Sequence, residues 1–232
     1  MASSGTRTFN LQIADVIQEA YERLGVSSKG GYDLITARRS LNLLMIKWIN
    51  QGVNLFTLHL HTVAVNSFNN TTYPTFDLAA NGYSDILTAA CRDTDATPDQ
   101  DIEMERISYA DWLSYPNKYA TGQPSQYFVD RQITPIINLY QAPNLSTYTT
   151  LKYYPINRIE DAGGYTKDPD TPFRFLPCMV AGLAYYISFM KAAEKTQMLK
   201  MAYEDEMKRA LDEDGSRTSL YISPQTFFGD GV

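Results

Sequence analysis

The sequence predicts an α+β protein in which helices from both chain ends build one domain around a β-rich insertion. Three observations support this fold class: helical apolar spacing near the N-terminus, strand-like segments through the middle, and helical spacing again near the C-terminus. The chain has 232 residues, 44% apolar and 20% charged, which is an ordinary globular composition. The predicted parts are 1–53 and 172–215, together a four-helix domain, 54–171, the insertion, and 216–232, an extended C-terminal arm.

The first 53 residues predict a helical hairpin. Apolar residues recur at helical spacing from Leu11 to Leu24, and Gly25 follows where a left-handed C-terminal cap is expected. A second helix is expected to begin near Asp33 and to stop at Gly52. Its apolar stripe consists of Leu34, Ala37, Leu41, Leu44, Met45, Trp48 and Ile49. Two such helices joined by a glycine-rich turn favour an αα-hairpin.

Strand-type patterns dominate from Leu55 to about Ile159. Threonine, valine and aromatic residues are frequent there, and proline, glycine and asparagine separate short segments. This punctuation favours an antiparallel sandwich or open barrel over βαβ units, with a short helix at Tyr109–Tyr115. The predicted strands are Leu55–Val65, Thr72–Leu78, Asp85–Arg92, Met104–Ser108, Gln126–Arg131, Thr134–Tyr140 and Tyr148–Ile156.

The stretch from Pro172 to Leu211 changes from an apolar run into a charged, methionine-rich amphipathic segment. Phe175–Met190 carries no charge, but as a helix it is only about 24 Å long, which is short of a membrane span. It therefore predicts a helix buried in the core of the protein. A fourth helix is expected to end at Gly215, and the remaining residues lack helical spacing, which predicts an extended arm.

Residues suited to catalysis or metal binding are sparse in the sequence. His59 and His61 are expected on the same face of one strand, but no third metal ligand is identifiable. Cys91 and Cys178 match no disulfide or zinc spacing, so both are expected to be reduced core thiols. Phosphate-loop motifs are also absent. We therefore expect no enzymatic activity, no cofactor and no bound metal.

Carboxylates gather in two places. The stretch from Asp93 to Glu105 is expected to be a solvated loop. The second group is expected on a solvated side of the last helix and is called here the acidic face. It consists of Glu204, Asp205, Glu206, Asp212, Glu213 and Asp214. Acid–base chemistry, a cation site, an intersubunit surface and a channel lining that repels DNA phosphates all remain open for these groups.

Two properties of the whole chain limit the classes of partner that it is expected to bind. The net charge of −6 argues against general binding to nucleic acid or acidic membranes. The 17 tyrosines and 10 phenylalanines fit a protein with extensive interfaces, where aromatic residues are favoured. The N-terminal sequence MASSGTRTF has no apolar signal core, so synthesis in the cytoplasm is expected.

Several segments, taken in order, carry a family resemblance. They are IADVIQEAYERLGV, GYDLITARRSLNLLMIKWINQGVNLFTLHLHTV, PNKYATGQPSQYFVDRQ and YYPINRIEDAGGYTKDPDTPFRFLPCMVAGLAYYISFMKAAEKTQMLKMAYEDE. The combination covers most of residues 10–213 and resembles head-to-tail adaptor (connector) proteins of short-tailed bacteriophages.

The resemblance implies a structural virion protein of the phage neck, made in the host cytoplasm. Such adaptors form a dodecameric ring beneath the portal, extend the DNA channel and give the tail a platform, and their helical domain makes much of the ring. The implied partners are other copies of the chain, the portal protein, tail nozzle, hub or fibre proteins, and genomic DNA passing without sequence-specific binding; no membrane is involved. The resemblance also implies that the C-terminal arm docks onto the portal through Tyr221, Ile222, Phe227 and Phe228.

Two other functions remain open on the sequence. A tail-tube or nozzle component would share the ring architecture but bind other rings. A small carboxylate-dependent cell-wall hydrolase of the tail would act as a monomer and would lose its activity when one Asp or Glu is replaced.

Overall fold

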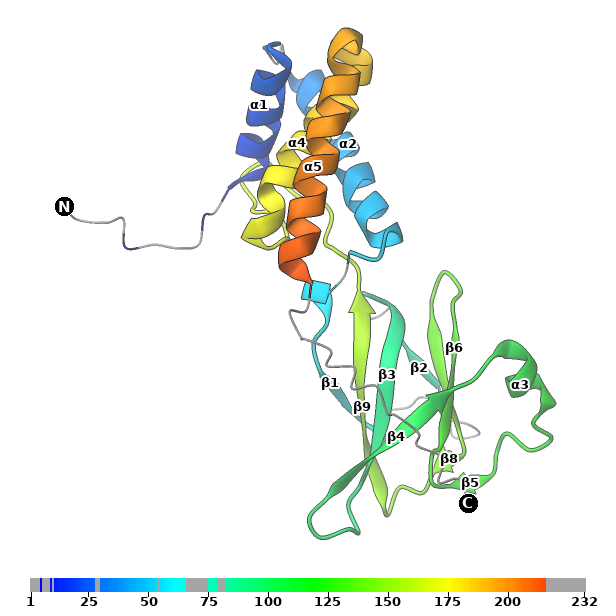
Figure 1. Ribbon diagram of the computed structural model, residues 1–232. Coiled ribbons are helices and arrows are strands. Elements are labelled where there is room, and N and C mark those ends of the chain that lie inside the picture. Colours follow the sequence, from blue (N-terminus) through cyan, green and yellow to red (C-terminus); the bar gives the residue numbers. More distant parts are fainter. Residues whose placement is uncertain are drawn as a thin grey trace, which may run out of the picture.

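The computed structural model describes residues 5, 9, 11–27, 30–53, 55–65, 75–78 and 82–215 of the chain. The described part is α+β, with five α-helices and a large, curled, mostly antiparallel sheet. The helices from the two ends of the chain gather at one end of the molecule, and the sheet, with the short helix Tyr109–Ser114 beside it, occupies the other (Figure 1). The α+β class predicted from the sequence is therefore confirmed.

Helices α1 (Ile13–Leu24) and α2 (Gly31–Asn50) follow the predicted periodicity. Helix α1 buries one stripe of its surface and ends at Gly25, whose φ of 71° is the left-handed cap that the sequence predicted. Its first N–H groups lack partners within the helix, and the carbonyls of Lys167 and Tyr165 accept hydrogen bonds from Ile13 and Ala14, both at 2.9 Å. The chain segment that returns from the sheet is thereby tied to α1.

Helix α4 (Leu176–Lys191) lies at the centre of the helical part. The 3₁₀ turn η4 (Phe173–Phe175) precedes it, and after η5 (Ala193–Lys195) the chain continues into α5 (Thr196–Asp214). By length and mean hydropathy alone, Phe173–Lys191 is long and apolar enough to cross a membrane, but 56% of its apolar window is buried inside the protein. Because α4 packs against α1, α2 and α5 at once, its environment is that of a core helix, as expected.

Buried side chains form two cores. One is built from α1, α2, α4 and α5 around Trp48 and Phe175, whose ring centroids lie 5.7 Å apart. The other lies on the sheet and includes Tyr127, Tyr153 and Cys91. Each core is formed by apolar residues that recur with the period of its own elements, which is 3.6 residues in the helices and 2 in the strands.

The seven strands of the main sheet lie in the order β1-β9-β3-β4-β6-β7-β2. The strands β5 and β8 pair separately, and the helix α3 (Tyr109–Ser114) lies between β4 and β5 in the chain, close to the predicted short helix. The strand bounds are β1 His61–Ala64, β2 Thr75–Asp77, β3 Tyr83–Asp93, β4 Gln100–Arg106, β5 Thr121–Gly122, β6 Gln126–Asp130, β7 Ile136–Tyr140, β8 Ala142–Pro143 and β9 Tyr148–Asn157.

Three sequence-based expectations about the insertion were wrong in part. The segment Leu55–Thr57 is a 3₁₀ turn, η1, so the first strand begins only at His61, where pairing with β9 begins. In the stretch from Asp93 to Glu105, residues 94–99 form the expected loop, but the residues from Gln100 onward belong to β4, where Ile102 and Met104 alternate with the carboxylates and turn toward the sheet interior. The sheet is also not purely antiparallel: the chain crosses over through α3 and returns with β6 parallel to β4.

Candidate functional site

The predicted portal-docking arm lies outside the described residues. This applies to the whole segment from residue 216 to residue 232, including Tyr221, Ile222, Phe227 and Phe228. The last helix, α5, leads directly into this segment, and its final turn is described up to Gly215.

The acidic face does not form one uniform surface. Glu204, Asp205, Asp212 and Glu213 are exposed, whereas Glu206 and Asp214 are partly covered. Glu204 lies 3.6 Å from Lys200 and Glu206 lies 3.1 Å from Arg209, so basic neighbours offset part of the negative charge.

Asp214 has a different environment from the rest of the acidic face. Its side chain is 4% exposed and accepts a 2.7 Å hydrogen bond from Arg174 Nε, with a second contact to Arg174 Nη2. The arginine belongs to η4, just before α4. This carboxylate therefore joins the end of α5 to the start of α4 and is not part of a solvated surface.

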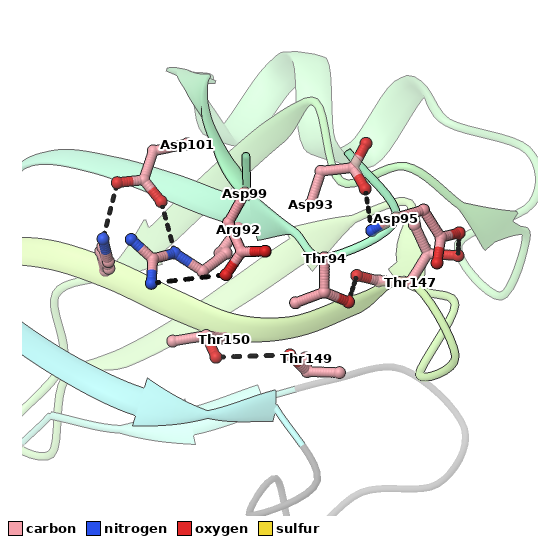
Figure 2. A network of polar contacts seen from close by, with 10 residues as sticks. Arg92, Asp93, Thr94, Asp95, Asp99, Asp101, Thr147, Thr149 and Thr150 are labelled. Carbon is pink, nitrogen blue, oxygen red and sulfur yellow. Dashed lines mark hydrogen bonds and ion pairs between the residues drawn. The ribbon is translucent and has the colours of Figure 1, made fainter. Parts of the chain in front are cut away.

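The first carboxylate stretch forms a polar network on the hairpin of β3 and β4 (Figure 2). Asp101 accepts hydrogen bonds from Arg92 Nε at 2.9 Å and from Lys152 Nζ at 2.6 Å. The Arg92 guanidinium, together with Lys152, holds the pKa of Asp101 below its usual value. A glycosidase acid needs a raised pKa, so this carboxylate is unsuited to donating a proton. The network is better explained as a solvated surface that ties β3, β4 and β9 together.

The two histidines meet at one tyrosine, although only His61 is in a strand. The hydroxyl oxygen of Tyr83 lies 3.4 Å from His59 Nε2 and 3.2 Å from His61 Nδ1. His59 Nδ1 lies 3.2 Å from the carbonyl oxygen of Thr57, which only accepts, so this nitrogen carries a proton. With both rings neutral, Tyr83 then donates to His59 and accepts from His61. Burial lowers the pKa of His61, and nearby His59 lowers it further. The cluster joins the segment that follows α2 to the start of β3.

The remaining reactive groups are inert in this fold. Cys91 and Cys178 are free and buried, and burial raises their thiol pKa to about 11 and about 12. Thiols with such pKa values are not nucleophiles at neutral pH, which confirms the expected core role. Within the described ranges, no three His, Cys, Asp or Glu side chains are grouped so that they could hold a metal ion.

Helix α2 carries an apolar surface that the sequence analysis missed. Besides its buried stripe, it exposes Tyr32 (80%), Ile35, Leu43 and Ile46, with Arg39 among them. These residues recur every three or four positions, so they lie on one side of the helix, opposite its buried stripe. The spacing of these exposed residues is visible in the sequence. The prediction for this helix, however, considered only the stronger apolar stripe, which faces the core. Helix α2 is therefore apolar on two sides, of which the helical core covers one.

Helices α4 and α5 expose a second apolar surface near their junction. It is formed by Phe189 and Met190 at the end of α4 and by Met198 and Met201 at the start of α5. Methionine side chains are flexible and polarizable, so they adapt to irregular surfaces.

Two hollows border these helices. An open groove of about 690 Å³ between α1 and the start of α4 has an apolar floor that includes Leu11 and Val180, with acidic side chains from α1 along its rim. A cleft of about 580 Å³ lies between the end of α2 and the sheet, where Ile46 and Ile49 face Arg131 and Arg158.

Comparison with known proteins adds no assignment. No family model matches the sequence, and no curated protein matches it either.

Proposed function

We propose that this chain is a structural virion protein, the head-to-tail adaptor of a short-tailed phage. Copies of it form a ring beneath the portal, extend the DNA channel and join the tail. In this proposal α1, α2, α4 and α5 are the four-helix domain that makes the ring, and the β-rich insertion 54–171 faces tail components. The arm Ser216–Val232 docks onto the portal.

The observation that carries the proposal is the second apolar side of α2. Tyr32, Ile35, Leu43 and Ile46 are exposed on a helix whose opposite side is already buried in the helical core. A ring of identical subunits needs one surface that meets a different surface of the next copy. The exposed methionines of α5 supply such a second surface.

The arrangement favours a scaffold over the hydrolase alternative. Asp101 is held ionised by two basic side chains, and buried Asp85 lies 2.9 Å from Arg106 and 3.5 Å from Arg131. The net charge of −6 also suits a conduit through which DNA passes without being bound.

Deleting Ser216–Val232 is expected to abolish attachment to isolated portal rings while leaving folded subunits. The physical reason is that the deletion removes Tyr221, Ile222, Phe227 and Phe228, the large apolar and aromatic side chains proposed to anchor each subunit on the portal. Co-sedimentation with portal rings measures attachment, and circular dichroism with thermal unfolding verifies that the truncated chain is folded.

Each outcome of this experiment has a distinct meaning. Portal binding by the truncated chain would contradict the arm assignment alone. A full-length chain that ignores portal rings but binds tail rings would support the nozzle alternative. In a separate activity assay of the full-length chain, hydrolysis of cell-wall material by the monomer would overturn the structural function.

A further inference from the structure

We infer that helix α2 of one copy packs in parallel against helix α5 of a second copy, with Arg39 beside Asp205. This contact is the subunit interface of the proposed ring, and to that extent the inference rests on the proposed function. The contact itself involves neither the portal nor the C-terminal arm, so it can be tested without them.

The outward stripe of α2 has a defined order. Tyr32 and Ile35 form its apolar beginning, Arg39 follows as a single charge, and Leu43 and Ile46 continue it toward the sheet. All five side chains are exposed, and the residues that α2 sends into the core lie on the opposite side.

The outward stripe of α5 begins in the same order, with a charge of the opposite sign, and then continues with charged instead of apolar residues. Met198 and Met201 form an apolar beginning, Asp205 follows as a single charge, and Asp212 lies further toward the sheet. These four residues have the same sequence intervals as Tyr32, Ile35, Arg39 and Ile46. When the helices are placed side by side in parallel, methionines meet the tyrosine and isoleucine, and Asp205 meets Arg39.

The cleft beside Ile46 extends the complementarity to Asp212. Arg131 and Arg158 line this cleft. Among the described residues of its lining, the one carboxylate is Asp85, which is 10% exposed and already bound by Arg106 and Arg131. The cleft is therefore electropositive. Asp212 of a neighbouring copy, which falls opposite Ile46 in the parallel register, brings a negative charge to it.

Arg209 is the residue of α5 that falls opposite Leu43 in this register. Its guanidinium is 3.1 Å from Glu206 on the same helix, so its charge is already offset. The aliphatic stem of the arginine is then available to cover the leucine.

The two outward stripes cannot meet within one copy, because α2 and α5 already contact each other there through their inward sides. Trp48 of α2 donates a 3.0 Å hydrogen bond to Tyr203 of α5 in the core, so the outward sides point away from this contact. Both helices run toward the sheet (Figure 1). Rotating one copy about an axis along the helices keeps them parallel and brings α2 of one copy to α5 of the next, which gives a heterologous contact able to close a ring.

Charge reversal tests the pairing without portal proteins. Arg39→Asp and Asp205→Arg are each expected to weaken self-association of the full chain by roughly tenfold or more, because each places like charges together. Mixing the two variants should restore assembly, since every alternating contact is again opposite in charge. Sedimentation velocity at several concentrations measures the effect, and Arg23→Asp on α1 is the control that leaves association unchanged.

Cysteine cross-linking provides the second measurement. A chain carrying both Ile35→Cys and Met201→Cys should form a covalent head-to-tail ladder on oxidation, whereas either change alone gives dimers at most. The native thiols are buried and do not compete. Absence of a ladder, or reversal variants that assemble like the wild type, would overturn the inference. Restored assembly in a chain that ignores portal rings would keep the contact and refute the adaptor function.

Discussion

Replacing Gly182 with valine is expected to lower the free energy of unfolding by about 3 kcal/mol. A Cβ atom on this residue of α4 would lie 2.8 Å from Leu44 Cδ2 and 2.9 Å from Tyr203 Cε2. Leu44 is fully buried on α2, and the Tyr203 ring of α5 is fixed by its hydrogen bond with Trp48. Neither neighbour can yield without separating helices that pack on α4, so the added atoms produce overpacking.

The substitution Gly182→Ala separates this steric effect from helix propensity. Alanine gains about 1 kcal/mol in a helix relative to glycine, but overpacking costs about 1–3 kcal/mol, so a smaller net destabilisation is expected. Gly31→Ala is the matched control, because Gly31 begins α2 with nothing within 4 Å of its Cβ position. Urea unfolding measures all three variants. Equal stability of Gly182→Val and the wild type would show that α2 and α5 approach α4 less closely than described.

The same glycine links stability to the proposed assembly. Gly182 sets how near α2 and α5 lie to α4, and these two helices carry the outward stripes. A variant that shifts them is therefore expected to lose association before it loses its fold.

The helices were largely predictable because their signals are local. Apolar spacing and Gly25 located α1, and the uncharged run Phe175–Met190 located α4 to within about one residue at each end. The apolar pattern did not predict that α4 contacts three helices at once. That arrangement depends on residues distant in sequence, such as Leu44 and Tyr203 beside Gly182.

The sheet was less predictable because pairing is non-local. Strands could be predicted from composition, but the sequence of a single strand does not indicate that β6 pairs in parallel with β4. The charge of the stretch from Asp93 to Glu105, considered alone, favours a solvated loop. The alternation of Ile102 and Met104 with carboxylates is the strand signal that should have taken precedence.

The surface residues show the same limit. The outward stripe of α2 follows from spacing once the inward stripe is assigned, so Tyr32 and Ile35 were within reach of sequence analysis. The environment of Asp214 was not, because its partner, Arg174, is forty residues away in the sequence. A carboxylate that looks solvated by composition is buried once such a partner folds against it.

Replacing Arg174, the partner of Asp214, is the second change that is expected to have a large effect on stability. Arg174→Met is expected to lower the free energy of unfolding by about 3 kcal/mol, because it leaves a carboxylate that is only 4% exposed without its counter-charge. The Arg174 side chain itself is 26% exposed, so water can reach the site and hold the effect at the lower end of the range for buried pairs. Thermal and urea unfolding measure the change. Hydrogen exchange at the last turn of α5 should rise with it, because the pair anchors that turn.

Two further variants identify the cause. Lys200→Met removes an exposed ion pair on the same helix and should change stability by no more than about 0.5 kcal/mol. Adding Asp214→Asn to Arg174→Met removes the stranded charge and should recover part of the loss. If the double variant is as unstable as the single one, the loss comes instead from packing, since the Arg174 guanidinium also lies 5.6 Å from the centre of the Phe175 ring. Recovery would show that charge compensation by Arg174 holds the last turn of α5 in place.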